Sequence, residues 1–141
     1  MRTTRKHFTL SLGLLIITIM ACKFNVSTAN ISSLKLGKDK SLSQPTTNFE
    51  VGDTVYAVAD ISNASSPLKV KGRLVVEAAE GQQSGPLPGL EKIIDMPGSG
   101  TATFNFFPSP EWPKGKYKVE IFMLNEEGEQ KDQKSETFTI S

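Results

Sequence analysis

The sequence predicts an all-β fold, a single sandwich of about seven antiparallel strands that follows an N-terminal export signal. Three observations carry this prediction. From residue 31 to the C-terminus, apolar and polar residues alternate with the period of two that is typical of half-buried strands. Glycine, proline, asparagine and serine residues interrupt the alternation at short intervals and mark turns. No segment shows the 3.6-residue period of an amphipathic helix.

The first half of the domain is expected to contribute three strands. Residues 31–36 form a short strand, and a polar loop over residues 37–48 follows. The second strand covers residues 55–61, and the third covers residues 68–78 with Gly72 in its middle as a predicted β-bulge. The residues expected to face inward on the third strand are Leu68, Val70, Leu74, Val76 and Ala78.

The second half is expected to contribute four more strands. A loop rich in glycine, proline and glutamine over residues 80–90 precedes them, and an acidic hairpin loop over residues 125–134 separates the last two. We interpret this acidic loop as a solvated turn, because its spacing matches no calcium-binding loop. The four strands are expected at residues 92–96, 102–106, 117–123 and 136–140.

The segment that leads into the sixth strand carries a recognisable motif. Its sequence, Trp112-Pro-Lys-Gly-Lys-Tyr117, resembles the entry to strand F of immunoglobulin-like and fibronectin type III-like domains. Tyr117 occupies the position of the tyrosine corner, in which the tyrosine hydroxyl bonds back to the preceding backbone. The antibody-type disulfide and a tryptophan on the third strand are missing. The resemblance over residues 31–141 therefore implies an Ig-like sandwich of the broad bacterial group.

The first 21 residues have the organisation of an export signal. Arg2, Arg5 and Lys6 form a basic start without acids, and residues 10–21 are largely apolar. A stable transmembrane helix needs about 20 apolar residues, and this stretch is shorter. We therefore expect residues 1–21 to be a signal peptide.

The signal ends in Ile19-Met20-Ala21-Cys22, which resembles the lipobox of bacterial lipoproteins, and Cys22 is the single cysteine of the chain. The resemblance implies that Cys22 is lipidated, that residues 22–30 form a short tether, and that the domain is anchored to an envelope membrane. Lys23 replaces the aspartate that favours inner-membrane retention, so a cell with two membranes would place the protein in its outer membrane. The alternative is ordinary cleavage after Ala29, which would give a soluble secreted or periplasmic protein.

Composition excludes several kinds of function. Removal of residues 1–21 leaves one domain of 120 residues with 13 basic and 15 acidic residues, which gives no electrostatic argument for binding nucleic acid. The single histidine, His7, lies in the signal, so histidine-based catalysis and the usual zinc or copper ligands are absent from the mature chain. We therefore expect no enzyme, metal or cofactor. A carboxylate-based hydrolase is the weakest alternative.

Two surfaces are candidates for binding. The loop that contains Phe107 and Trp112 is stiffened by prolines and carries an aromatic pair that would anchor a partner if exposed. The alternative is that Trp112 caps the core and Phe107 lies under the loop. Phe122 breaks the inward alternation of its strand and would extend the patch if exposed. The alternative surface is a basic face for an anionic envelope polymer or lipid head group. Its five cations are Lys69, Lys71, Arg73, Lys116 and Lys118. Glu77 and Glu120 would oppose them, so the alternative is a solvated face with cross-strand ion pairs.

The expected function is therefore that of a lipid-anchored envelope module for binding or assembly, which contacts another envelope protein. Binding of an anionic polymer through the basic face is the second hypothesis. The two differ in salt dependence, because binding through exposed charges weakens as ionic strength rises.

Overall fold

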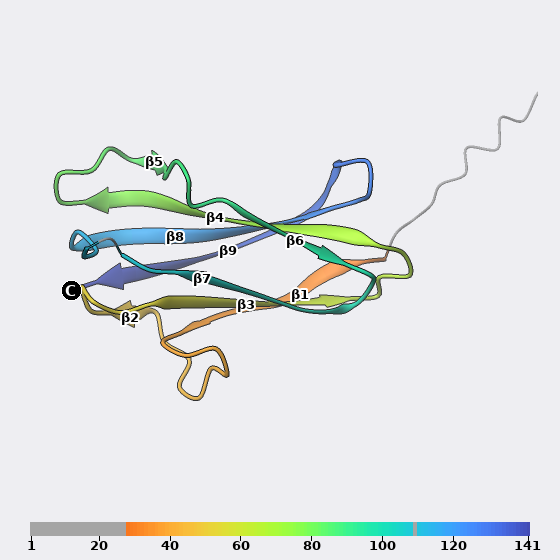
Figure 1. The fold of residues 1–141 in the computed structure, drawn as a ribbon, viewed down its shortest axis with the longest axis horizontal. Coiled ribbons are helices and arrows are strands. Elements are labelled where there is room, and N and C mark those ends of the chain that lie inside the picture. Colours follow the sequence, from red (N-terminus) through yellow and green to blue (C-terminus); the bar gives the residue numbers. More distant parts are fainter. Residues whose placement is uncertain (1–27, 109) are drawn as a thin grey trace, which may run out of the picture.

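A computed structural model describes residues 28–108 and 110–141, in which nine strands form two facing sheets and no helix occurs (Figure 1). The predicted signal over residues 1–21, the lipidation site Cys22 and most of the predicted tether lie outside these described residues. Within them there is no apolar helix long enough to span a membrane.

The smaller sheet has the order β1-β3-β7, with β1 at Asn30–Gly37, β3 at Val55–Ser62 and β7 at Gly100–Phe106. The larger sheet has the order β2-β9-β8-β4-β5, and β6 also pairs with β4. Its strands are β2 (Asn48–Phe49), β4 (Leu68–Ala79), β5 (Gly85–Pro86), β6 (Lys92–Met96), β8 (Gly115–Leu124) and β9 (Gln130–Ile140). All pairs are antiparallel except β2 with β9, which is parallel.

This topology is that of an Ig-like sandwich. The strands β4, β8 and β9 stand where strands C, F and G form one sheet, and β1, β3 and β7 stand where A, B and E form the other. The short β2 leaves the sheet of β1 and joins β9, so the N-terminal part of the domain contributes to both layers. The prediction of an all-β sandwich is confirmed.

The core lies between the sheets and comes from the alternation that the sequence shows. Residues at 55, 57, 59 and 61 of β3 are buried, and those at 117, 119, 121 and 123 of β8 face them from the other sheet. Near the C-terminus the rings of Phe49, Trp112, Tyr117 and Phe138 pack together, with centroid distances of 5.4–6.2 Å. Aromatic pairs in such geometries add to the stabilisation that burial of their area gives.

The prediction of a bulge at Gly72 is wrong. Gly72 pairs regularly with Ile121 and faces inward, where a Cβ atom would lie 2.7 Å from Cδ1 of Phe104. The glycine is needed there because the Phe104 ring occupies the space of a side chain. The irregularity lies instead between Val76 and Ala78, and it turns Ala78 outward to an exposed position.

Two further boundaries differ from the expectation. Strand β9 begins at Gln130, so the acidic loop is only residues 125–129 and its predicted second half is strand. The first residues of β9 are polar on both faces, which hides the alternation of a strand. The two-residue strands β2 and β5 fall at the end of one predicted loop and inside the other, and they raise the number of strands above seven.

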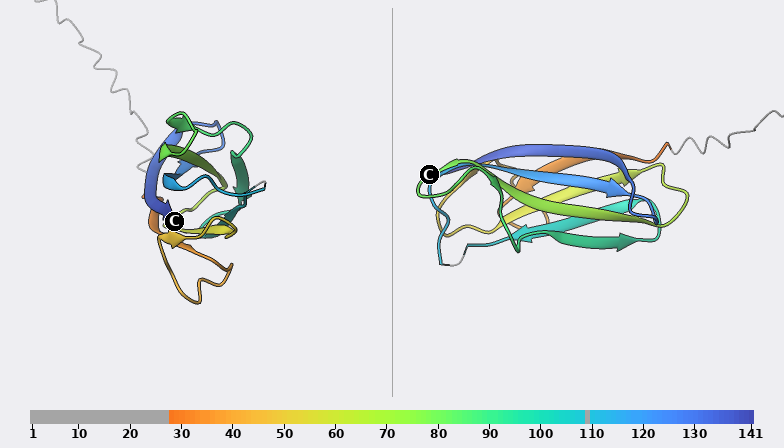
Figure 2. Two further views of the ribbon diagram at one scale, coloured as in Figure 1. Left: turned by 90° about the vertical axis from the view of Figure 1, so that its left-hand side faces the viewer. Right: turned by 90° about the horizontal axis from the view of Figure 1, so that it is seen from above.

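The sandwich is elongated, and β1 begins at one end while β9 and the chain finish at the other (Figures 1 and 2). We call the end where β1 begins the proximal end. It carries the β3–β4, β6–β7 and β8–β9 connections. The opposite end, which we call the distal end, carries the β4–β6 and β7–β8 connections (Figure 1). The loop over residues 38–47 projects from the side of the body (Figure 2).

The start of β1 is fixed by side chains of the other sheet. The backbone N–H of Ile31 donates to Oδ2 of Asp132 at 2.8 Å, and the Lys134 ammonium donates to the Ile31 carbonyl at 3.5 Å. These two bonds form a clasp between β1 and β9 at the point where the chain enters the sandwich.

Candidate functional site

A pocket of about 300 Å³ opens at the distal end. One wall comes from the β4–β6 connection, with Leu87, Pro88 and Leu90, and the other from the β7–β8 connection, with Phe107, Pro108 and Pro113. The buried Trp112 and Tyr117 form its base, and Gln82 and Glu111 are its remaining lining residues. We call this feature the distal pocket. It is mainly apolar and is stiffened by three prolines.

Trp112 is not the exposed anchor that its place on the loop suggested. Its side chain is only 5% exposed, and its indole packs edge-on against Tyr117 with centroids 5.5 Å apart. The indole N–H donates to the carbonyl of Asp53 at 2.7 Å, so burial leaves no polar atom of the ring unpaired. Trp112 therefore closes the distal end of the core and supports the pocket from below.

Tyr117 has the geometry of a tyrosine corner. Its hydroxyl donates to the carbonyl of Pro113 at 2.5 Å, which bends the β7–β8 connection back onto β8. Burial raises the pKa of Tyr117 above its ordinary value of 10.0, because the ionised phenolate would lose solvation. The bond fixes the segment that forms one wall of the distal pocket.

Phe107 points away from the core at the rim of the pocket and is 60% exposed. It follows the inward-facing Phe106, so the alternation of β7 turns it outward as expected. The ammonium of Lys92 lies 5.7 Å from the Phe107 ring and also donates to the backbone and side-chain oxygens of Asn105, at 2.6 and 2.9 Å. Phe107 thus stands on a segment that is tied to β6.

Phe122 points outward from β8 as expected but is not exposed. Only 7% of its surface is accessible, because Lys71 and Arg73 on the neighbouring strand lie over its ring at 5.1 and 5.0 Å. Long cationic side chains cover apolar surface in this way while their charged ends stay in water. The expectation that Phe122 adds to an exposed aromatic patch is therefore wrong.

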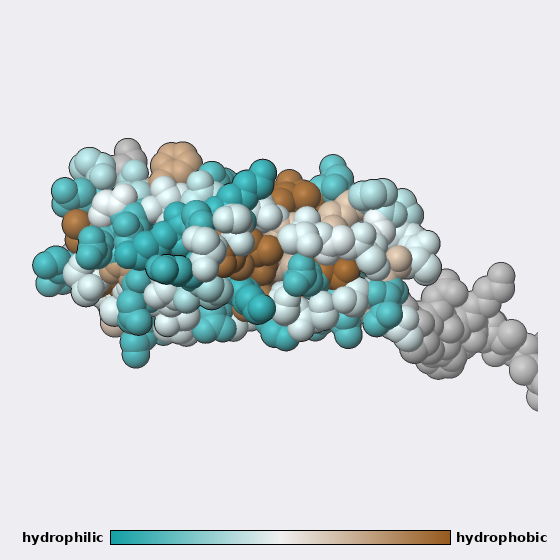
Figure 3. Space-filling model, turned by 90° about the horizontal axis from the view of Figure 1, so that it is seen from below, coloured by the Kyte–Doolittle hydropathy of each residue, from teal (hydrophilic) through white to brown (hydrophobic). Residues whose placement is uncertain are grey.

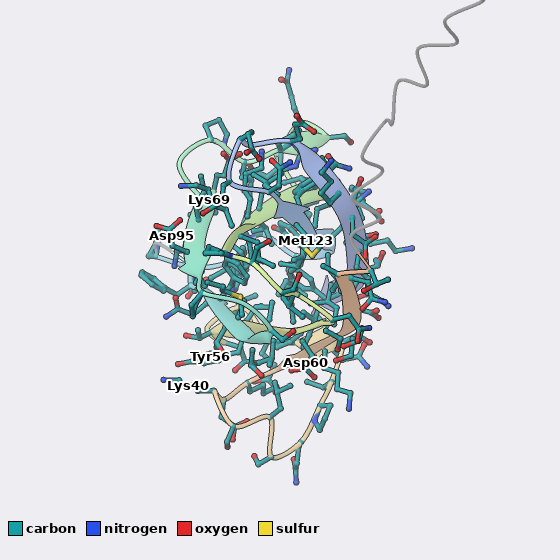
Figure 4. All side chains as sticks on the ribbon, turned by 90° about the vertical axis from the view of Figure 1, so that its right-hand side faces the viewer. Lys40, Tyr56, Asp60, Lys69, Asp95 and Met123 are labelled. Carbon is teal, nitrogen blue, oxygen red and sulfur yellow. The ribbon has the colours of Figure 1, made fainter. Side chains whose placement is uncertain are left out.

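The five predicted cations do share the outer face of the larger sheet, but acidic residues offset most of them. Arg73 donates to the buried Glu120 at 2.9 Å, and Lys118 also pairs with Glu120 at 3.3 Å. Lys69 and Asp95 lie side by side at 3.1 Å (Figure 4), and Lys71 pairs with Glu91 at 3.9 Å. Among the described residues only Lys116 of this set makes no ion pair. The face therefore carries little uncompensated charge.

The other carboxyl groups with shifted pKa values form hydrogen bonds or ion pairs with neighbouring residues. Hydroxyl donors from Ser33 and Thr101 lower the pKa of Asp60, which lies on the outer face of the smaller sheet near the proximal end of β3. The backbone N–H of Glu50 and the ammonium of Lys38 lower the pKa of Asp53. The described ranges contain no group of three histidine, cysteine or acidic residues that could hold a metal ion. Seen from the side of β3, hydrophilic residues gather toward the distal end of the surface, and hydrophobic residues are exposed between paler ones along its middle (Figure 3).

The sequence pointed to one wall of the distal pocket and missed the other. Residues 80–90 were expected to be an ordinary loop, yet Leu87 and Leu90 pack partly against the core and line the pocket. Two leucines spaced three apart among prolines and glycines are the signal that could have indicated a loop folded onto the domain.

No family model and no curated protein matches this chain. Solved structures do resemble it. A calcium-binding mutant of β-glucuronidase 2 from Bacteroides uniformis is 15% identical with a TM-score of 0.52, over 79% of this chain and 14% of the enzyme. The β-glucosidase of Listeria innocua is 12% identical with a TM-score of 0.52, over 77% of this chain and 16% of that one.

An immunoglobulin-like protein from Pseudomonas aeruginosa is 13% identical with a TM-score of 0.46, over 80% of this chain and 96% of that one. Because this chain spans only about a seventh of the β-glucuronidase, the similarity concerns one sandwich domain within a much larger enzyme. At these identities the comparisons show the fold alone.

Proposed function

We propose that this chain is a lipid-anchored, non-catalytic binding module of the cell envelope, which contacts another envelope protein through the distal pocket. The observation that carries the proposal is the exposed Phe107 at the rim of an apolar pocket of about 300 Å³. Exposed aromatic side chains beside preformed pockets are typical anchors of protein interfaces. The absence of histidine and of any free thiol from the mature sequence supports a binding function over catalysis.

The positions of the two ends support an anchored module. The chain enters the sandwich at the proximal end (Figure 1), whereas the residues of the distal pocket lie at the opposite end. A chain tethered through Cys22 would therefore hold its proximal loops toward the membrane and its pocket away from it. Residues 23–30 reach at most about 25 Å, so such a tether keeps the domain near the bilayer while the pocket faces outward.

The start of the domain favours cleavage before Cys22 over cleavage after Ala29. Ala29 packs against the core and lines a small cavity at the proximal end with Leu68, Met123 and Leu124. Asn30 is already the first residue of β1, and the next residue, Ile31, is buried in the clasp. Cleavage after Ala29 would remove a packed residue and place the charged terminus on the strand itself.

Binding of an anionic polymer is less well supported. Four of its five predicted cations already pair with acids on the same face, and an added polyanion would have to displace these acids. The distal pocket needs no such rearrangement. We therefore retain the protein-binding hypothesis alone.

Site-specific photo-crosslinking tests the proposal. A benzoylphenylalanine at position 107 is expected to form an adduct with a defined envelope protein in intact cells, and the same probe at position 93 is the matched control. Ile93 is the other large exposed apolar residue among those described, at 56% exposure, and it lies outside the pocket. Equal adducts from both positions, or none from position 107, would contradict the proposal. Intact mass of the Cys22→Ser variant checks the anchor separately, through loss of the acyl mass.

A further inference from the structure

We infer that the distal pocket accepts an apolar side chain that is followed or preceded by a lysine or arginine, on an exposed segment of the partner protein. This inference rests on the proposed function and names the chemistry that the pocket recognises. It follows from which polar atoms of the pocket are free, from its size and from the sign of its only charge.

The polar atoms at the base of the pocket are already occupied. The Trp112 indole N–H is bonded to Asp53, and the Tyr117 hydroxyl is bonded to Pro113. Of the other lining residues only Gln82 and Glu111 have polar side-chain atoms, and leucine, proline and phenylalanine form the rest of the walls. A sugar needs several donors and acceptors in fixed positions, so most of its hydroxyl groups would lose water here without replacement. An apolar group loses nothing of this kind and gains from burial.

The size of the pocket fits one or two side chains. A volume of about 300 Å³ lies at the lower limit of pockets that hold small-molecule ligands, so the pocket suits an inserted side chain better than an extended cofactor. Phe107 at the rim can cover the inserted group and exclude water around it. This arrangement matches an anchor residue on a peptide segment.

Charge complementarity defines the neighbour of the anchor. Among the residues that line the pocket, Glu111 alone is charged, and it is exposed and forms no hydrogen bond or ion pair with the described residues. The Lys92 ammonium keeps its charge while it donates to Asn105 and lies 5.7 Å from the Phe107 ring, but Lys92 does not line the pocket. A cation beside the anchor residue would therefore be attracted by Glu111, whereas an acid there would be repelled.

Other occupants from this chain fit less well. The predicted tether, residues 23–30, reaches about 25 Å, whereas the 12 residues of β4 alone extend about 40 Å along the sandwich. The tether therefore cannot fold back from the proximal end into its own pocket. Two copies anchored in one membrane would point their distal ends in the same direction, so their pockets could not face each other.

The chain provides its own reporter for a test. Trp112 is its only tryptophan and lies in the pocket, so energy transfer from Trp112 to a dansyl group measures occupancy at this site. The full chain, extracted from its membrane in detergent, is titrated with three dansyl peptides that differ only in a central pair: Leu-Lys, Leu-Glu and Ser-Lys. We expect the Leu-Lys peptide to bind about fivefold more tightly than the Leu-Glu peptide and at least about tenfold more tightly than the Ser-Lys peptide.

Two variants complete the design. Glu111→Lys is expected to reverse the preference, so that Leu-Glu binds more tightly than Leu-Lys, and Phe107→Ala is expected to weaken both peptides. Ile93→Ala, the matched exposed control, should leave all affinities unchanged. Equal binding of Leu-Lys and Leu-Glu, an unchanged preference in Glu111→Lys, or no transfer with any peptide would overturn the inference. If cross-linking from position 107 persists in that case, the proposed function stands and only the assigned chemistry fails.

Discussion

Replacement of Gly72 by alanine is expected to destabilise the domain, although alanine is normally the better residue in a regular strand. The added Cβ would lie 2.7, 2.9 and 3.0 Å from three atoms of the Phe104 ring, closer than packed carbon atoms tolerate. Phe104 is only 1% exposed and is held between the two sheets, so the ring cannot turn away into solvent.

The magnitude follows from two opposing effects. Alanine restricts the unfolded chain and stabilises by about 0.4–1 kcal/mol, whereas overpacking a filled core costs about 1–3 kcal/mol. The steric cost is the larger, so we expect a net loss of about 1–2 kcal/mol in the free energy of unfolding. For a domain of this size, this loss corresponds to a decrease in melting temperature of about 5–10 °C.

Urea titration and calorimetry measure this loss, and Gly52→Ala is the matched control. A Cβ at Gly52 would meet nothing within 4 Å, so this variant should be as stable as the native chain or slightly more stable. Adding Phe104→Leu to Gly72→Ala should cost less than Phe104→Leu costs alone, because the smaller side chain relieves the clash. Native stability in Gly72→Ala would refute the argument that the Phe104 ring fixes this glycine.

Three further predictions concern charge and hydrogen bonding. Arg73→Ala should reduce the free energy of unfolding by about 1–2 kcal/mol in urea titrations, because it removes one partner of the buried Glu120, whereas Lys69→Ala at an exposed pair should change it by less than about 0.5 kcal/mol. Because the pKa of Tyr117 is raised above 10.0, its contribution to stability should be fully present below pH 10 and be lost as the pH rises through the folded pKa. The free energy of unfolding of Tyr117→Phe should be about 1 kcal/mol lower than that of the native chain at neutral pH and should decrease less at alkaline pH. Because the pKa of Asp60 is lowered below 3.8, its contribution should be present above that pH and be lost as the pH falls through the folded pKa, so Asp60→Asn should flatten the acid limb of the stability curve.

The sequence predicted the sandwich because alternation reports directly which residues face the core. The inward residues of β3, β7 and β8 follow from their parity, and Phe107 and Phe122 leave it as expected. The odd or even position of a residue in a strand predicts which face of the sheet its side chain lies on, but not whether other side chains cover it. Phe122 is covered by cations from β4, a contact that depends on strand register and cannot be read from either strand alone.

The candidate site was only partly predictable for a related reason. Trp112 lies in a proline-rich loop without alternation, so the sequence could not show whether its indole turns toward Tyr117 or toward solvent. The opposite wall, with Leu87 and Leu90, comes from a connection about 20 residues earlier in the chain. Only the paired register of β4 with β8 brings these two connections to the same end of the molecule.

The clasp at the start of β1 has a mechanical consequence. Strand β1 runs along the long axis, and its hydrogen bonds to β3 lie across that axis. Tension between the first strand residue and the opposite end would therefore strain the whole ladder together in shear, with no single bond to open first. Asp132 and Lys134 add resistance at the point where a pulling force enters. A force across the long axis would break the same bonds one after another. We therefore expect the domain to unfold at a higher force when it is pulled along its long axis than when β1 is pulled sideways from β3.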